Sequence, residues 1–291
     1  MKILFLNDFK TSTLQSDVLF HGLKSIFEEV VDYPKLNYMY GKFDVNNPFS
    51  LKTPQQIRNL FGIFGSDHTD RLNIVNKVKN NYFDYIFVAD PKTVNPVLTE
   101  IIDFVPDNRL VWIDGSDSVF PEYYIAKGIY FKKEIEVGCI GTCSINLAIP
   151  KEKIKSDSGF LKNKFLADNK VLIEYESEKK FYSEIASSYF TDTNTNYKQE
   201  WDTMILYEAI ANYSIPFYRN FTSMPSKMCN HLPKSLFEQV NAKIELEGFT
   251  WVYTNRDLYL DLQNKLRDYL IKNCTTQMLA KKIIDKLQSF Q

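Results

Sequence analysis

The first half of the chain alternates short apolar runs with segments of helical periodicity. The apolar runs, which we predict to be strands, fall at Lys2–Leu6, Val30–Tyr33, Tyr85–Ala89, Leu110–Ile113 and Ile129–Phe131. The segments between them with a helical pattern are Ser16–Glu29, Asp70–Asn80 and Val97–Phe104. Continuous apolar strands separated by helices are typical of a parallel sheet that is covered on both faces. The pattern therefore predicts an α/β fold that begins with a Rossmann-like domain.

The pattern changes at the charged segment KEKIKSDSGFLKNKFLADNK, which we interpret as an interdomain connection. A second alternation follows, with strands predicted at Val171–Tyr175, Tyr189–Thr191 and Ile215–Tyr218. Helices are predicted at Lys180–Ser188, Trp201–Asn212, Lys234–Ile244 and Asn255–Lys272. The tail Thr275–Phe290 has one apolar stripe and predicts a separate amphipathic helix. A chain of 291 residues is long enough for two domains. We expect domains at residues 1–155 and 156–274, followed by a C-terminal helix at residues 275–291.

Composition narrows the class of partner. The formal net charge is -1, which gives no general attraction to nucleic acid. The four cysteines form no CxxC pair and only three histidines are present, so we expect no metal site and free thiols in a reducing compartment. The apolar run of MKILFLNDF is too short for a signal peptide, and no segment has the length of a membrane span. A cytoplasmic location is expected, with contact at the inner face of the membrane left open.

Two glutamates mark the candidate chemistry of the second half. Glu208 lies near the edge of the buried face of the predicted helix Trp201–Asn212, where a carboxylate can accept hydrogen bonds from the two hydroxyls of a ribose. Glu200 lies at or just before the start of that helix, where main-chain N–H groups favour an anion such as a diphosphate, and where a glutamate can instead hold sugar hydroxyls. Arg219 follows the predicted strand IPFY and can bind a phosphate through two hydrogen bonds. These residues are candidates for nucleotide binding.

Three aspartates are candidates for a catalytic base in the first half. Asp114 and Asp117 follow the apolar run LVWI, and Asp8 follows the first predicted strand. Ligands of open α/β sheets bind beyond the carboxyl ends of the strands, which is where these carboxylates are expected. Lys132 and Lys133 follow a further strand and can offset the negative charge of a leaving phosphate.

Three segments carry a resemblance to a known family. EWDTMILYEAIANYSIP, which contains Tyr207, resembles the E-x7-E region of retaining GT-B glycosyltransferases and, more closely, the matching segment of the glycosyltransferase-family-1-like and CgeB-like group. MPSKMCNHLPKSLFEQV resembles the segment that follows this motif, and WIDGSDSVFPEYYIAKGIYFKKE resembles a stretch of the first domain. The sequence departs from the family at Tyr213, where the family has glycine, and in the loop LNDFKTSTLQ, which has none.

The resemblance implies a GT-B-like fold, in which two Rossmann-like domains face a central cleft and a C-terminal helix crosses between them. It implies a glycosyltransferase that takes a nucleotide-sugar donor, needs no essential metal and uses a glycan or lipid-linked acceptor, in bacterial surface polysaccharide assembly. Donor binding would involve Glu208, Glu200, Arg219, Tyr207, Lys132 and Lys133. Two alternatives stay open. One is a sugar-nucleotide epimerase, and the other is a non-catalytic scaffold with a decayed donor site.

Overall fold

The computed structural model describes residues 1–7, 13–40, 60–92, 95–116, 127–133, 135, 141–154, 204–211, 215, 231–247, 251 and 254–290. The chain divides into two compact units. The first unit comprises Met1–Pro150 together with Thr275–Gln291, and the second comprises Lys151–Cys274. Several predicted elements lie outside the described residues. They are the helix Lys180–Ser188, the strands Val171–Tyr175 and Tyr189–Thr191, and the strand Ile215–Tyr218 apart from Ile215.

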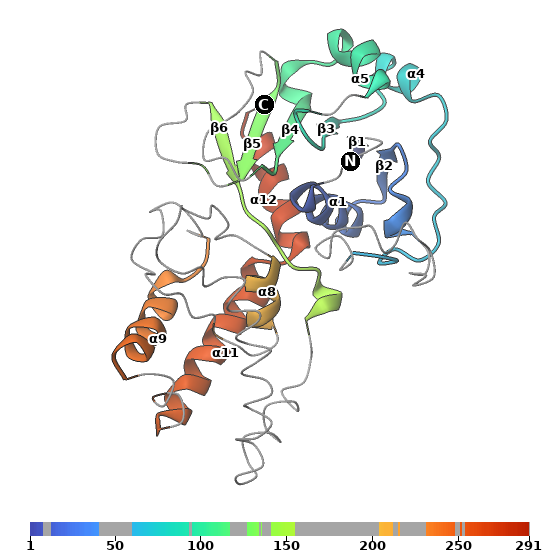
Figure 1. Ribbon diagram of the computed structural model, residues 1–291. Helices are drawn as coiled ribbons and strands as arrows, with labels where there is room; N and C mark the ends of the chain where they lie inside the picture. Colours follow the sequence, from blue (N-terminus) through green and yellow to red (C-terminus); the bar gives the residue numbers. More distant parts are fainter. Residues whose placement is uncertain are drawn as a thin grey trace. The chain divides into compact units, whose positions relative to one another are not determined.

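A parallel sheet forms the centre of the first unit (Figure 1). Within the described residues it has six strands in the order β2-β1-β3-β4-β5-β6, and every neighbouring pair is parallel. The strands are β1 (Lys2–Leu6), β2 (Glu29–Tyr33), β3 (Tyr85–Val88), β4 (Leu110–Asp114), β5 (Ile129–Lys133) and β6 (Thr142–Ile145). The chain passes from β1 to β2 in one direction and from β3 to β6 in the other. This open parallel topology confirms the α/β prediction and is consistent with a Rossmann-like fold.

Helices cover the two faces of this sheet, and the alternation of side chains along β1 shows which helix covers which face. Leu4 and Leu6 pack in one cluster with residues of α4 (Ile74–Lys79) and α5 (Pro96–Ile101). Phe5 points to the opposite face, where its ring centroid lies 5.2 Å from that of Phe20 on α1 (Leu14–Ile26). Successive residues of a strand face opposite sides, so α1 and the pair α4–α5 cover opposite faces.

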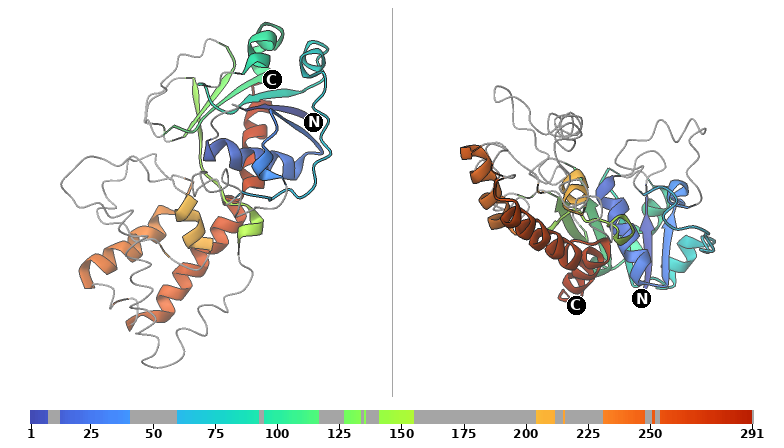
Figure 2. Two further views of the ribbon diagram at one scale, coloured as in Figure 1. Left: turned by 45° about the vertical axis from the view of Figure 1, so that its right-hand side comes forward. Right: turned by 90° about the horizontal axis from the view of Figure 1, so that it is seen from below.

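The C-terminal helix α12 (Thr276–Gln288) belongs to the first unit and packs on α1, as Figure 2 shows. Thr275 begins the helix by accepting a hydrogen bond from the Met278 amide at 3.4 Å. Next to it, the Thr276 hydroxyl lies 2.8 Å from Nδ1 of the buried His21 on α1. Gly22 completes this contact, since an added Cβ there would lie 2.0 Å from the Thr276 carbonyl oxygen. The amphipathic stripe of α12, with Leu279, Ile283, Ile284 and Leu287, is buried.

The described part of the second unit is helical. Its elements are α8 (Met204–Ala211), α9 (Lys234–Glu247) and α11 (Arg256–Asn273). Helices α8 and α11 are in contact, and Nε of Arg267 on α11 donates to the Ala211 carbonyl at the end of α8. Leu262, Leu266 and Leu270 lie on the buried face of α11 at a spacing of four residues, as one face of a helix requires. Short 3-10 helices span Asn37–Met39, Ile102–Phe104 and Asp107–Arg109 in the first unit and Lys151–Lys153 in the second.

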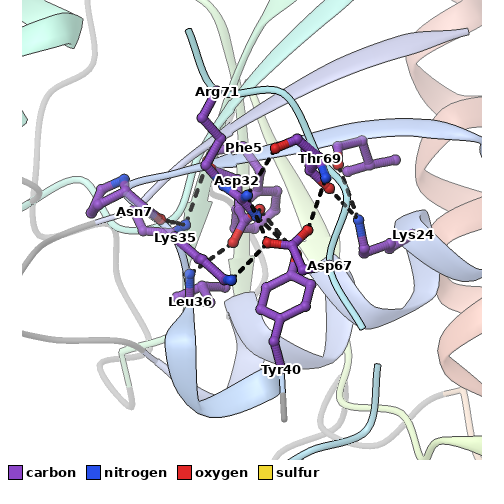
Figure 3. A network of polar contacts seen from close by, with 12 residues as sticks. Phe5, Asn7, Lys24, Asp32, Lys35, Leu36, Tyr40, Asp67, Thr69 and Arg71 are labelled. Atoms are coloured by element: carbon purple, nitrogen blue, oxygen red, sulfur yellow. Dashed lines mark hydrogen bonds and ion pairs between the residues drawn. The ribbon is translucent and has the colours of Figure 1, made fainter. Parts of the chain in front are cut away.

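A buried network of charges fixes the end of β2 (Figure 3). Asp32 has no solvent exposure and accepts hydrogen bonds from the Leu36 amide at 2.7 Å and the Tyr40 hydroxyl at 3.0 Å. The guanidinium of Arg71 forms an ion pair with Asp32 and donates from Nη1 to Asp67 at 2.7 Å. Asp32 stands at the end of the second strand, where dinucleotide-binding proteins have the acidic residue that binds a ribose. Since its oxygens are already bound to protein donors, Asp32 does not fill that role here.

Asp67 extends this network toward the surface. It accepts from Lys35 Nζ at 2.9 Å and from the Thr69 amide at 3.1 Å, in addition to Arg71. Burial by itself raises the pKa of Asp67, but the hydrogen bonds from Arg71, Lys35 and Thr69 together lower it well below its ordinary value of 3.8. Burial beside Asp32 also raises the pKa of Tyr40 well above its ordinary value of 10.0, so this hydroxyl remains a donor.

The lowered pKa of Asp67 predicts an acid sensitivity. A carboxylate with a lowered folded-state pKa stabilises the fold fully above its unfolded value of 3.8, and this stability is lost as the pH falls toward the folded value. We expect Asp67→Asn to reduce the difference in unfolding free energy between pH 7 and pH 3, measured by urea denaturation. Asp70→Asn is the control, because the Asp70–Lys77 pair is exposed and should matter little. Equal pH dependence in Asp67→Asn and the wild type would contradict the prediction.

Among the differences from the expected elements are two helix boundaries and one strand that was not predicted. Helix α4 begins at Ile74 rather than Asp70, because Asn73 adopts a left-handed backbone conformation with φ of 54°. Helix α1 ends at Ile26 because Glu29 already pairs with Lys2 in the sheet. Strand β6 was not predicted. It is an edge strand of the sheet that the described residues form, and three of its four residues (Thr142, Cys143 and Ser144) are partly or fully exposed.

Candidate functional site

The carboxyl ends of the parallel strands form the candidate site of the first unit. In open α/β sheets ligands bind there, close to the point where the strand order reverses, which in this sheet lies between β1 and β3. Several polar residues at this edge are almost completely buried, namely Asn7, Gln15, Ser16, Asn95, Asp114 and Lys132. Buried polar groups are costly unless they are hydrogen-bonded, so the partners of each residue indicate what this edge can do.

The first turn of α1 is tied to the end of β3. Thr13 is the N-cap residue, and its hydroxyl oxygen accepts from the Ser16 amide at 3.2 Å. The same hydroxyl donates to Ser16 Oγ at 2.8 Å, and Ser16 Oγ in turn donates to the Ala89 carbonyl. This chain of hydrogen bonds fixes the start of α1 against the strand on the other side of the switch point.

Gln15 lies in the same turn and faces the loop after β4. A Cβ at Gly115 would lie 2.7 Å from Gln15 Cβ and 3.0 Å from Thr13 Oγ1, so only glycine allows this close approach. Gln15 is 1% exposed, and its Nε2 donates to the Asn146 carbonyl at 2.8 Å. Its Oε1 is buried and accepts no hydrogen bond from the described residues.

Asn7 follows β1 directly, and its side-chain amide, like that of Gln15, donates hydrogen bonds to backbone carbonyls. Its Nδ2 donates to the Pro34 carbonyl at 3.2 Å and to the Phe5 carbonyl at 3.5 Å. Asn95, the N-cap residue of α5, donates from Nδ2 to the Asn7 carbonyl at 2.9 Å and so ties the loop after β3 to the end of β1. The Oδ1 atom of Asn7 is buried and, like Oε1 of Gln15, has no hydrogen-bond partner among the described residues.

Asp114 and Lys132 form a buried pair at the ends of β4 and β5. They are opposite each other in the strand register, and Lys132 Nζ lies 3.7 Å from Asp114 Oδ1. Asp114 also accepts from the Ser116 amide at 2.8 Å and from the Tyr130 hydroxyl. Lys132 Nζ donates to the Ser116 carbonyl and, at 3.1 Å, to Ser116 Oγ. Both carboxylate oxygens of Asp114 are therefore engaged, and the pair fixes the backbone at Ser116.

Lys133, the neighbour of Lys132 and also a predicted candidate, has a buried side chain that lies on the other face of the sheet. Side chains alternate along β5, so Lys133 faces the same side as Phe131 while Lys132 faces the same side as Tyr130. The two lysines therefore do not act at one point of the site.

In the second unit, Tyr207 and His231 are in direct contact. Tyr207 is buried on α8, and its hydroxyl lies 2.5 Å from Nε2 of the half-buried His231. The two rings stack with centroids 5.9 Å apart. The contact joins EWDTMILYEAIANYSIP to MPSKMCNHLPKSLFEQV, two segments in which we saw the family resemblance. Glu208, the next residue of α8, is half-buried and engaged in interactions of its own.

The other candidate residues, Asp8, Asp117, Glu200 and Arg219, lie outside the described part of the chain. The structure thus brings together Asp114 with Lys132, and Tyr207 with His231. In the described ranges, no group of three or more His, Cys, Asp or Glu residues is placed to hold a metal ion. Among the helices that the structure describes, none is both long enough and apolar enough to cross a membrane.

Sequence reasoning missed the amides at the carboxyl edge. Asn7 had a usable signal, because it follows β1 directly, just as Asp114 ends β4. Only charged side chains were predicted as candidates at the strand ends, and the neutral amides were not. Gln15 had no such signal, since its burial depends on Gly115 and on the Asn146 carbonyl, both more than 90 residues away in sequence.

The chain matches no known family model, and neither a curated protein nor a solved structure matches it. The class that the structure itself defines is an α/β protein with an open, all-parallel, Rossmann-like sheet. Its buried polar groups gather at the edge where such sheets bind their ligands.

Proposed function

We propose that the chain is a GT-B-like glycosyltransferase that moves a sugar from a nucleotide-activated donor to a hydroxyl group of a glycan or lipid-linked acceptor. The contact between Tyr207 and His231 is the observation that carries the proposal. It joins two segments that resemble consecutive parts of one donor site in that family. The Rossmann-like sheet of the first unit also has the architecture of one of the two domains that such an enzyme needs.

The roles divide between the two units. In the second unit, Glu208 accepts hydrogen bonds from the donor ribose, Tyr207 holds His231, and Glu200 and Arg219 bind the sugar and the diphosphate. In the first unit, the acceptor lies at the carboxyl edge of the sheet, where Asp114 and Lys132 hold the loop at Ser116. The acceptor oxygen bonds to the anomeric carbon as the bond from that carbon to the phosphate breaks. The acceptor proton goes to a base, for which Asp8 and Asp117 are the candidates because Asp114 is fully engaged.

Glu208→Gln tests the donor site. A hydrogen bond to a charged group contributes about 1.5–3 kcal/mol, so the variant should bind its nucleoside diphosphate about 10- to 100-fold more weakly. Calorimetric titration with UDP, GDP, ADP and TDP measures this directly. Glu238→Gln on α9 is the matched control, because Glu238 is an exposed helical glutamate, and it should bind like the wild type. Equal affinity in Glu208→Gln and the wild type would remove Glu208 from the donor site.

A non-catalytic binding protein is the second candidate. Two observations favour it. Asp114 is buried and bound to Tyr130, Ser116 and Lys132, so it offers no base. Tyr213 also replaces the glycine of the family motif. On this reading the wild-type chain binds none of the nucleotides in the same titration.

A further inference from the structure

We propose that the ligand held at the carboxyl edge of the first unit is a neutral polyhydroxy compound, recognised by hydrogen bonds that its hydroxyls donate to Gln15 Oε1 and Asn7 Oδ1. This inference rests on the proposed function, because it names the chemical class of the acceptor. It also assigns two specificity-determining residues that were not among the candidates predicted from the sequence. Both flank the connection between β1 and α1, at the edge where a parallel sheet binds its ligand.

The orientation of both amides is fixed by neighbouring carbonyls. Gln15 must place its NH2 group toward the Asn146 carbonyl, and Asn7 must place its NH2 group toward the Pro34 and Phe5 carbonyls. Exchanging the oxygen and nitrogen positions of either amide would place the amide oxygen against a backbone carbonyl oxygen, and the two would repel each other. The atoms left over, Oε1 and Oδ1, are therefore acceptors, and each needs a donor.

Neither acceptor finds its donor among the described residues, although both residues are only 1% exposed. A buried acceptor without a donor costs about 1–3 kcal/mol, so two of them at one edge are a substantial loss of stability. Groups that lower the stability of the free protein in this way are typical of binding sites, where a ligand supplies the missing hydrogen-bond partner. Each of the two acceptors therefore indicates a missing donor group, which a ligand at this edge would supply.

The charge around these acceptors selects the kind of donor. A phosphate or carboxylate presents oxygens that would repel Oε1 and Oδ1. The charges of Asp114 and Lys132 offset each other within their buried pair, and neither one adds a net charge to this edge. Hydroxyl groups are neutral donors, and a sugar carries several of them. A neutral sugar therefore matches the site better than a sugar phosphate or an organic acid.

Saturation-transfer NMR on the full chain tests the proposal with methyl glycosides of glucose, galactose, mannose and N-acetylglucosamine, each compared with its 6-phosphate. We expect at least one neutral glycoside to bind the wild type, and its phosphate to bind about tenfold more weakly or not at all. Tighter binding of the phosphates, or binding of no glycoside, would overturn the proposal. This comparison uses the wild-type protein, so it stands whether or not the variants fold.

Gln15→Met then separates a binding role from a structural one. Methionine keeps the length of the side chain but removes Oε1 and also the Nε2 donor to the Asn146 carbonyl, so the neutral glycoside should bind at least tenfold more weakly and the unfolding temperature should fall. Asn241→Leu is the matched control. Asn241 is a buried amide of the second unit that also donates to a carbonyl, at 2.8 Å, so its loss should lower the unfolding temperature and leave glycoside binding intact. Gln15→Met overturns the proposal if it binds the glycoside as tightly as the wild type does.

The outcome is independent of the donor site. Nucleotide binding that depends on Glu208, without glycoside binding, would refute this inference and leave the transferase proposal standing. Glycoside binding that depends on Gln15, without any nucleotide binding, would support the inference and refute the transferase.

Discussion

Gly22→Ala is expected to unfold at a temperature roughly 6–12 °C below that of the wild type, which corresponds to a loss of about 3 kcal/mol. The added Cβ would lie 2.0 Å from the Thr276 carbonyl oxygen and 2.6 Å from the Thr276 carbonyl carbon, both backbone atoms that cannot rotate away. Helix α12 would have to shift along α1, which disturbs the hydrogen bond between His21 and Thr276. Helix propensity acts in the opposite direction, since alanine is favoured over glycine in a helix by about 1 kcal/mol.

Differential scanning calorimetry measures the effect, and Gly65→Ala is the matched control. Gly65 has a φ of 47°, and a Cβ there would meet nothing within 4 Å. Its replacement should cost only the strain of the left-handed backbone, about 1–2 kcal/mol. If Gly22→Ala were as stable as the wild type or more stable, helix propensity would dominate and the close contact between α1 and α12 would be wrong.

Arg71→Met is expected to destabilise the protein by about 3–5 kcal/mol, because it leaves the buried charge of Asp32 without its ion-pair partner. Asp32 is completely buried, so the carboxylate cannot turn to solvent for compensation. Asp67 would keep its ion pair with Lys35, so Asp32 is where most of the cost arises. Equilibrium urea unfolding at pH 7 measures the loss.

Two further variants identify the cause. Lys77→Met removes a cation from the exposed pair with Asp70, whose side chain is 62% exposed, and should cost less than about 1 kcal/mol. The double variant Asp32→Asn/Arg71→Met removes both charges, and the neutral amide can still accept from Tyr40 and Leu36. We expect it to be more stable than Arg71→Met alone. A double variant that is less stable would show that Arg71 acts through packing rather than through charge.

The sequence predicted most of the first unit because the signal there is local. Runs such as KILFL and YIFV are apolar on both faces, and this composition by itself indicates buried parallel strands. The amphipathic tail was also predicted by its own periodicity, and the structure has it as α12. Strand β6 escaped because an edge strand has polar, exposed positions and lacks that signature.

The candidate site was only partly predictable. Asp114 and Lys132 stand at strand ends, so their position at the carboxyl edge followed from the order of elements along the chain. Their pairing did not follow from it, because it depends on the register between β4 and β5 and on the burial of both side chains. That burial turns Asp114 from an available base into an engaged ion-pair partner.

By itself, the sequence determined the α/β class, the buried strands and the amphipathic C-terminal helix, since each depends on the spacing of apolar residues within one segment. Only the tertiary structure decided that α12 packs on α1 through Gly22, that Arg71 neutralises Asp32, and that Gln15 meets Gly115 and the Asn146 carbonyl. These contacts join residues far apart in the chain, with 39 positions between Asp32 and Arg71 and 131 between Gln15 and Asn146. Periodicity within one segment carries no information about such pairs, because their energies come from burial and close approach, which exist only once the elements have packed.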